Sequence, residues 1–236
     1  MKKLVGKTYV CADIHGLWER YIQVYDHVGP DDTLYILGDV IDRGADGIKI
    51  IKDIMKRKNV ELLIGNHEHM LLQALYKKNS AIFDLWCSVG NGGGITYTML
   101  INEPLWMQYS ILCYLIRRPL CVSVQIEDTL YVLTHSGPVK LGIGNQLKYY
   151  EANDQLRDMI TWYSPYRNDT YIPFEAYDLQ YHYIIGHVPV QKREKDTILT
   201  CDNITDIDCG CAMAHLREDT SLTLLCLNDF TVQYLK

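Results

Sequence analysis

Short apolar runs alternate with amphipathic stretches through the first quarter of the chain. Residues 8–12, 33–37 and 60–64 have the β-rich, apolar character of buried strands. The stretches 17–27 and 48–57 between them repeat apolar positions at helical spacing. This β-α-β-α-β order predicts a parallel sheet, because parallel strands need a crossover connection and usually use a helix for it.

Helical patterns dominate the middle of the chain. They cover residues 70–77, 82–87 and 105–115, with a glycine-rich break at 92–94. We assign this part to an excursion that forms one wall of a cleft.

Apolar, β-rich runs resume in the second half, mostly joined by links of hairpin length. The predicted strands cover residues 120–126, 130–134, 182–185, 197–200, 222–227 and 230–235. This half is therefore expected to be antiparallel or mixed. The predicted fold is α/β, with two mixed sheets packed as a sandwich and flanked by helices in αββα layers. No linker-like stretch divides residues 1–236, so one domain is expected.

Composition excludes several classes of protein. The 236 residues carry a formal charge of −6 with scattered basic residues, which argues against a nucleic-acid partner. The most apolar stretch, 111–116, ends at Arg117 and is too short for a membrane span, which needs about 18 to 20 residues. Eight cysteines lie mostly in apolar runs and nothing resembles a signal peptide, so we expect reduced, buried thiols in a cytoplasmic protein.

Polar residues follow the predicted strands at their carboxyl ends. The first three strands lead into DIHG (13–16), GDVIDRG (38–44) and GNHE (65–68), and later strands lead into THSG (134–137) and GHVPV (186–190). Ligands of open α/β sheets bind at this edge, so we expect these clusters to converge. The candidate metal ligands are Asp13, His15, Asp39, Asn66, His135 and His187.

The types of these six residues point to two divalent cations. Mixed oxygen and imidazole ligands suit manganese, iron or zinc better than calcium, and six ligands exceed the needs of one tetrahedral site. Two cations about 3.5 to 4 Å apart activate a bridging water and bind phosphate oxygens. Single histidines are more often core residues and single aspartates turn residues, but six at strand ends together favour a metal-dependent phosphoesterase.

A candidate general acid and a candidate phosphate-binding residue are adjacent to these residues in the sequence. His67 adjoins Asn66 and could donate a proton to a leaving group, with Asp42 orienting its imidazole. Arg43 offers a guanidinium suited to phosphate oxygens. The alternative roles are a helix cap for His67, a turn carboxylate for Asp42 and a structural ion pair for Arg43. The remaining histidines match no motif and are assigned ordinary structural roles; they are His27, His69, His182 and His215.

Together these motifs resemble the phosphoprotein phosphatase superfamily of calcineurin-like metallophosphoesterases, and within it the bacterial and phage, lambda-type protein phosphatase branch. With DCGC (208–211), the resemblance spans nearly the whole chain. An NGGG run at 91–94 also resembles this branch and is assigned no chemistry.

The resemblance implies a role for each matching residue. One metal would be bound by Asp13, His15 and Asp39, and the other by Asp39, Asn66, His135 and His187. His67 would be the general acid paired to Asp42, and Arg43 and Asn66 would contact the phosphate. The implied cofactor is a pair of Mn²⁺ ions, with iron, zinc or nickel as alternatives.

The chain departs from this branch at one position. A second phosphate-binding arginine usually follows a tryptophan there, but Trp162 is followed by Tyr163, Ser164 and Pro165. Arg167, on a slightly longer loop, is therefore the candidate for this contact with the substrate phosphate.

The resemblance implies a Ser/Thr-type protein phosphatase in which a metal-bridging water attacks the phosphorus directly. Its substrates would be phosphoserine and phosphothreonine, with phosphotyrosine and small phosphate esters in addition. The alternative is symmetrical diadenosine-tetraphosphate hydrolase, a related family that typically lacks the Asp of DRG and has Asp after GNH. This chain has Asp42 and Glu68 there, which favours the phosphatase. A catalytically inactive scaffold is a third hypothesis, disfavoured by the complete ligand set.

Overall fold

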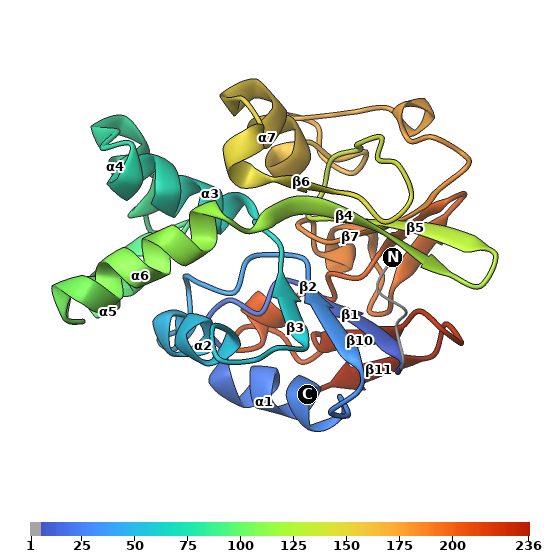
Figure 1. The fold of residues 1–236 in the computed structure, drawn as a ribbon, viewed down its shortest axis with the longest axis horizontal. Coiled ribbons are helices and arrows are strands. Elements are labelled where there is room, and N and C mark those ends of the chain that lie inside the picture. The colour runs from blue at the N-terminus through green and yellow to red at the C-terminus, as the bar shows by residue number, and fades with distance from the viewer. Residues whose placement is uncertain (1–5) are drawn as a thin grey trace.

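The computed structural model describes residues 6–236, in which two β-sheets face each other between outer helices (Figure 1). Residues 1–5 of the predicted domain lie outside the described residues. The first sheet has the order β11-β10-β1-β2-β3. Its strands are β1 (Thr8–Cys11), β2 (Thr33–Ile36), β3 (Val60–Leu62), β10 (Leu222–Cys226) and β11 (Val232–Leu235). Strands β1, β2 and β3 are parallel, as predicted, and β10 pairs antiparallel with both its neighbours.

The second sheet has the order β6-β4-β5-β7-β9-β8. Its strands are β4 (Pro119–Ile126), β5 (Thr129–Thr134), β6 (Gln146–Lys148), β7 (His182–Ile185), β8 (Leu199–Cys201) and β9 (Ile204–Asp206). The pairs β5-β7 and β7-β9 are parallel and the others antiparallel, so this sheet is mixed.

Helices cover the outer faces of both sheets. Helices α1 (Trp18–Asp26) and α2 (Gly47–Ile54) make the crossovers of the first sheet and pack beneath it, and α7 (Asp154–Trp162) packs over β4 of the second (Figure 1). The alternation of side chains along a strand supplies two cores. In β1, Val10 joins the core between the sheets, whereas Cys11 joins the core under the helices. The predicted α/β sandwich is confirmed.

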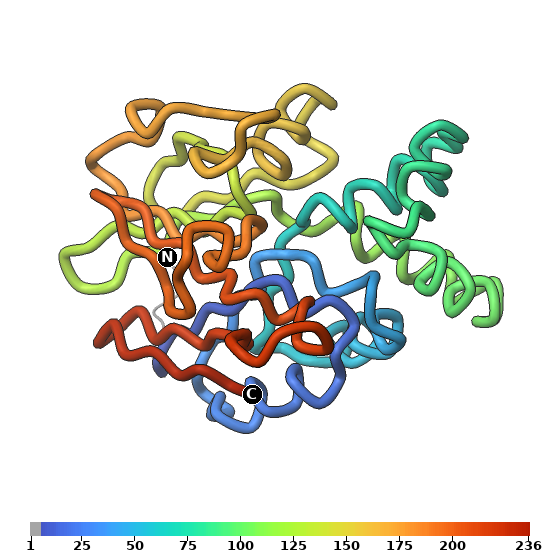
Figure 2. Tube along the Cα trace, turned by 180° about the vertical axis from the view of Figure 1, so that it is seen from behind, coloured from blue at the N-terminus to red at the C-terminus, as the bar shows by residue number. Residues whose placement is uncertain are grey.

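The middle of the chain forms a helical excursion to one side of the sandwich, which Figure 2 shows from behind. It contains α3 (Asn66–Leu71), a π-helical turn (Leu72–Tyr76), α4 (Ser80–Trp86), α5 (Gly93–Ile101) and α6 (Leu105–Ile116). The predicted glycine break is instead the start of α5. Gly92 precedes that helix with φ of +75°, a left-handed conformation that glycine adopts without strain.

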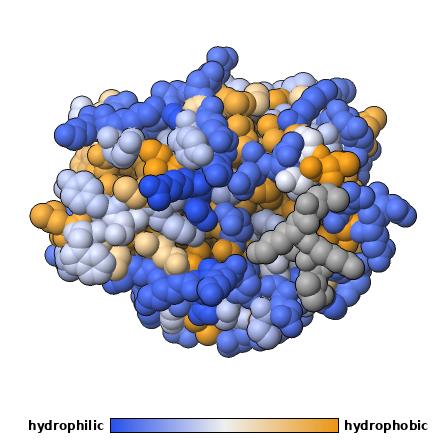
Figure 3. All heavy atoms as spheres, viewed as in Figure 1, coloured by the Kyte–Doolittle hydropathy of each residue, from blue (hydrophilic) through white to orange (hydrophobic). Residues whose placement is uncertain are grey.

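Apolar side chains are exposed on this excursion. They include Ile101, Leu105, Trp106 and Tyr109, and Figure 3 shows apolar and weakly polar residues at the left edge, where α5 and α6 lie. The longest helix, α6, has 12 residues, and no helix within residues 6–236 has the length and apolar character needed to cross a membrane.

The cysteines are free, but the prediction that they are buried is wrong for some of them. Cys113 is exposed because it lies on an outward-facing part of α6, and Cys201 is exposed at the end of the edge strand β8. Helix α7 and strands β6 and β9 were not predicted; β6 and β9 have only three residues each, too few to show a period.

The THSG turn after β5 packs tightly against the last turn of α7. The amide nitrogens of Ser136 and Gly137 donate to the Ile160 carbonyl, at 3.1 and 2.9 Å. A Cβ on Gly137 would lie 1.9 Å from the carbonyl oxygen of Met159, far inside contact distance. Backbone atoms on both sides leave no room for a side chain.

Gly137→Ala is therefore expected to lower the free energy of unfolding by about 2 kcal/mol or more, since overpacking of this kind typically costs about 1 to 3 kcal/mol. Urea denaturation measures the change. The control is Gly90→Ala, because a Cβ on Gly90 meets nothing within 4 Å and should change stability by less than about 0.5 kcal/mol. Equal stability of the two variants would contradict the packing described for this turn.

Candidate metal centre

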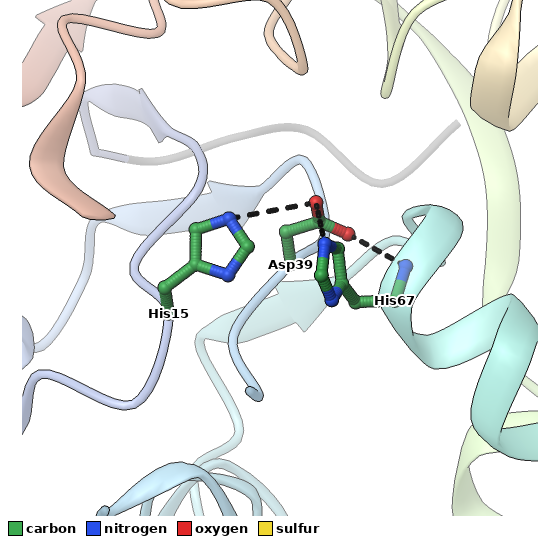
Figure 4. A group of neighbouring side chains, drawn as sticks. All are labelled: His15, Asp39 and His67. Carbon is green, nitrogen blue, oxygen red and sulfur yellow. Dashed lines mark hydrogen bonds and ion pairs between the residues drawn. The ribbon is translucent and has the colours of Figure 1, made fainter. Parts of the chain in front are cut away.

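Asp39 lies at the centre of the cluster formed by the strand ends. Its Oδ2 is 3.7 Å from Nε2 of His15 and 3.8 Å from Nε2 of His67, and these three side chains point toward one another in Figure 4. The same oxygen is 3.5 Å from Nε2 of His135. One buried carboxylate therefore faces imidazoles from three separate turns.

The other predicted ligands lie on either side of Asp39. The Oδ1 of Asn66 is 2.9 Å from Nε2 of His135 and 3.0 Å from Nδ1 of His187. Two ligands about 2.1 Å from one cation and at right angles to each other are about 3.0 Å apart, so this spacing suits a shared cation. On the opposite side, Oδ1 of Asp13 is 4.0 Å from Nε2 of His15, while its Oδ2 accepts the amide of His187 at 3.0 Å. The structure thus brings all six predicted residues together.

Backbone carbonyls orient two of the imidazole rings. Nδ1 of His15 lies 3.1 Å from the Ile41 carbonyl, and Nδ1 of His135 lies 2.7 Å from the Leu37 carbonyl. A carbonyl only accepts, so each Nδ1 carries the hydrogen and each Nε2 presents a lone pair to the cluster. This is the usual arrangement of a metal-binding histidine.

The charges of the cluster fit cation binding. Burial lowers the pKa of His15, His135 and His187, which keeps their imidazoles neutral and able to bind a metal. Burial alone would raise the pKa of Asp39, but positive charge on the surrounding imidazoles when they are protonated, His135 foremost, lowers the pKa overall.

Asp13 has too little positive charge around it. Burial raises its pKa well above the usual range, and the neighbouring carboxylates of Asp208 and Asp39 add to the effect. A divalent cation would reverse this penalty. Together these carboxylates and imidazoles form a His/Asp cluster that fits a binuclear metal centre. Donor atoms of His15, Asp39 and His67 lie within 4.8 Å of one another, as do those of Asp39, His135 and His187.

The turns that carry these residues are conformationally strained. Six residues of the site have positive φ values between 50° and 76° although none is glycine, a rare state for such residues. They are Asp13, His15, Asp39, Asp42, Arg43 and His187. Strain of this kind persists only where the surrounding structure fixes it, and it is concentrated at functional sites.

Glu68 fixes two of these turns relative to each other. Its carboxylate accepts the backbone amides of Asp39 at 2.8 Å, Val40 at 2.9 Å and Gly65 at 3.1 Å. Burial and the charge of Asp39 raise the pKa of Glu68 to about 7, while the amide donors act in the opposite direction. Glu68 was not predicted to be part of the site, although a glutamate three residues after a turn glycine indicates a capping role.

His67 and Asp42 form a buried pair. Nδ1 of His67 is 2.6 Å from Oδ2 of Asp42, so Nε2 faces the cluster. Burial lowers the pKa of His67, but the charge of Asp39 and the hydrogen bond with Asp42 outweigh it and raise the pKa overall. Proximity alone also groups His67 with His15 and Asp39 as metal-holding residues. The partner of Nδ1 sets His67 apart, however: it is the Asp42 carboxylate in His67 and a backbone carbonyl in His15 and His135.

A cleft of about 600 Å³ opens over the cluster and contains both candidate arginines. Arg43 reaches Nε2 of His15 at 2.9 Å and of His67 at 3.3 Å, and Arg167 reaches Nε2 of His187 at 3.1 Å. The loop that follows Trp162 therefore brings Arg167 next to His187.

Other residues of the cleft were not singled out from the sequence. Lys192, His215 and the loop at 89–92 also line it, and only the NGGG run gave a signal for any of them. His215, for which an ordinary buried or surface role is predicted, stands exposed at the cleft.

A family model described as calcineurin-like phosphoesterase matches residues 6–191. Among curated proteins, a symmetrical bis(5'-nucleosyl)-tetraphosphatase of Wigglesworthia glossinidia brevipalpis is 36% identical over 74 residues, which are 30% of this chain and 27% of the relative. The chain thus spans about a quarter of the length of that relative.

Solved structures match over nearly the whole chain. A putative diadenosine tetraphosphatase aligns with a TM-score of 0.66 and 14% identity, covering 100% of this chain and 95% of the other. A cold-active protein-tyrosine phosphatase of a psychrophilic Shewanella species aligns with a TM-score of 0.56 and 19% identity, covering 98% and 80%. At these identities the likeness extends to the fold alone.

Asp39→Asn is expected to weaken the binding of two cations at once, because the carboxylate faces both halves of the cluster. The chain, stripped with a chelator and dialysed against Mn²⁺, should bind two equivalents by elemental analysis, and the variant should lose affinity for both by more than about tenfold. Asp84→Asn, an exposed position on α4, is the control and should retain both. Two tightly bound equivalents in Asp39→Asn would show that Asp39 does not bridge.

Glu68→Gln is expected to lower the free energy of unfolding by about 1 to 3 kcal/mol, the cost of leaving buried polar groups unpaired. The amide group of glutamine would turn a donor toward one of the three backbone donors. Urea denaturation of the metal-free protein gives the value, with the exposed Glu218→Gln as the control. Identical midpoints for both variants would contradict the role given to Glu68.

Proposed function

Because this chain belongs to the calcineurin-like phosphoesterase family, which its residues 6–191 match, we propose that it is a metal-dependent phosphomonoesterase for alkyl phosphates such as phosphoserine and phosphothreonine in proteins. The observation that carries the substrate class is the buried His67-Asp42 pair, with 2.6 Å between Nδ1 and Oδ2. An alkoxide is a poor leaving group and needs a proton as the ester bond breaks, so a positioned acid matters most for esters of this kind.

Two divalent cations would be held by the six residues around Asp39. We propose Mn²⁺, with iron, zinc or nickel as alternatives, because mixed oxygen and imidazole ligands suit these ions. When bound, such a pair supplies a water of lowered pKa as nucleophile and a positive charge for the phosphate oxygens. Asp39 would lie between the two cations, with Asp13 and His15 on one side and Asn66, His135 and His187 on the other.

The chain itself would orient the ester and deliver the proton. Arg43 and Arg167 reach different histidines of the cluster, His15 and His187, and both guanidinium groups could bind phosphate oxygens there. Nε2 of His67 points into the same cleft. Its proton would pass to the leaving oxygen, and Asp42 would stabilise the protonated ring beforehand.

A second candidate is symmetrical hydrolysis of dinucleoside tetraphosphates, and the named relatives favour this candidate over the first. Lys192 stands exposed in the cleft and adds a positive charge beyond the two arginines, which suits a chain of phosphates. Anhydride cleavage releases a phosphate, however, whose second pKa is near 6. Such a leaving group has little need of the His67-Asp42 pair, and this is why we place the monoesterase first.

Turnover of a phosphoserine peptide and of diadenosine tetraphosphate by the manganese-loaded protein tests the choice. We expect the larger kcat/KM for the phosphopeptide. A clear preference for the dinucleotide would replace our first candidate with the second, and loss of all activity on both, and on p-nitrophenyl phosphate, would support an inactive scaffold.

His67→Asn is expected to slow the phosphopeptide by about 10² to 10⁴-fold while slowing p-nitrophenyl phosphate by less than about tenfold, because nitrophenolate leaves without an acid. Metal content measured on the same samples should stay at two equivalents. His27→Asn, on the exposed end of α1, is the control. Equal slowing of both esters, or loss of a metal, would indicate that His67 is a ligand instead of an acid.

A further inference from the structure

The NGGG run (91–94) and the end of α4 lie next to the turn that carries Asp42, the partner of His67. The indole Nε1 of Trp86 donates to Oδ2 of Asp42 at 2.7 Å, and both residues are fully buried. The same oxygen is 2.6 Å from Nδ1 of His67. One carboxylate oxygen is therefore held between two donors on opposite sides.

We propose that Trp86 is a positioning residue for proton donation: its N–H fixes the Asp42 carboxylate in the orientation that holds His67 toward the leaving group. The inference rests on the proposed function, because Trp86 can assist an acid only if His67 is one.

The Asp42 carboxylate has little else to hold it. Its other oxygen, Oδ1, is buried and makes no hydrogen bond in the described part of the chain. Rotation of the carboxylate would break the bonds to Trp86 and His67 together. Without the indole N–H, the contact with His67 would be the one remaining hydrogen bond to the carboxylate within residues 6–236.

Neighbouring residues fix the backbone of this turn as well as the carboxylate. Asp42 and Arg43 have φ values of +69° and +65°, and the amide of Asp42 donates to Oγ1 of Thr96 on α5 at 2.9 Å. Behind them, a Cβ on Gly92 would approach the amide nitrogen of Arg43 to 2.9 Å. The close approach of α5 to the turn therefore requires glycine.

The position of Trp86 is itself fixed. A Cβ on Gly93 would lie 2.4 Å from Cδ1 and Nε1 of the indole, so glycine allows α5 to pack on its edge. Phe83 and Tyr97 meet the ring edge to face, with centroids 6.2 and 6.4 Å away. Gly92 and Gly93 of NGGG thus have a physical role, which is to let α5 pack closely against both Trp86 and the Asp42-Arg43 turn.

A structural alternative exists, because any buried tryptophan needs an acceptor for its N–H. Trp86 could simply use Asp42 to satisfy that need while filling the core. The two roles differ in which ester they affect. A positioning role acts only where a proton must be delivered, whereas a packing role acts on every substrate alike.

Trp86→Phe in the full-length, manganese-loaded protein separates the two roles. We expect kcat for the phosphoserine peptide to fall about tenfold, a part of the ~10²–10⁴-fold that a positioned acid supplies, with KM unchanged. Turnover of p-nitrophenyl phosphate should change less than about twofold. Trp106→Phe, at a side chain 65% exposed on α6, is the matched control and should leave both rates unchanged. Equal slowing of both esters by Trp86→Phe overturns the proposal.

A second variant covers the risk that a core phenylalanine disturbs folding. Site-specific replacement of Trp86 by 3-benzothienylalanine keeps the shape of the indole and removes only the N–H donor. The same selective loss is expected, and wild-type rates with both esters would overturn the proposal.

A double-mutant cycle with Asp42→Asn tests the path of the effect. In the Asp42→Asn background, Trp86→Phe should slow the phosphopeptide no further, and a full additional tenfold loss would show that Trp86 does not act through Asp42. Failure of the proposed function has a different signature. In that case His67→Asn itself shows no selectivity between the two esters, and the role proposed for Trp86 is then wrong as well.

Discussion

Three backbone amides bound to one buried carboxylate hold the site together. Glu68 accepts from Asp39 and Val40 on one turn and from Gly65 on the next. These turns carry Asp39 and Asn66, which follow adjacent strands and would share one of the two proposed cations. Parallel pairing of β2 and β3 brings the turns near each other, but it does not fix their conformations. The three hydrogen bonds to Glu68 fix these conformations, including that of Asp39, whose φ value of +54° is strained.

The second constraint is electrostatic. The cluster concentrates carboxylates and neutral imidazoles in a space from which water is largely excluded, which is unfavourable unless a cation is bound. Asp13 is the clearest case of this unfavourable burial, because burial and two nearby carboxylates raise its pKa. The spacing of the ligand atoms and the shortage of positive charge around Asp13 therefore both indicate a cation-binding site. His67 is the exception in this cluster, because the charge of Asp39 and the hydrogen bond with Asp42 outweigh burial and raise its pKa.

Much of this arrangement was predictable from the sequence, for a definite reason. Apolar strands that end in DIHG, GDVIDRG and GNHE must place those residues at one edge of a parallel sheet, so the convergence of Asp13, Asp39 and Asn66 follows from the pattern. Contacts set by tertiary packing were not predictable. Trp86 lies 44 positions from Asp42 on a helix whose packing depends on glycines that the sequence marked as a break. Arg167 reaches His187 from a loop whose path no local pattern defines.

The central claim is that Asp39 lies between two cations bound at the strand ends. Anomalous diffraction from crystals grown with Mn²⁺, recorded above and below the manganese edge, tests it most directly. Two anomalous peaks about 3.5 to 4 Å apart, on either side of the Asp39 carboxylate, are predicted. A single peak, or peaks remote from Asp39, would contradict the account.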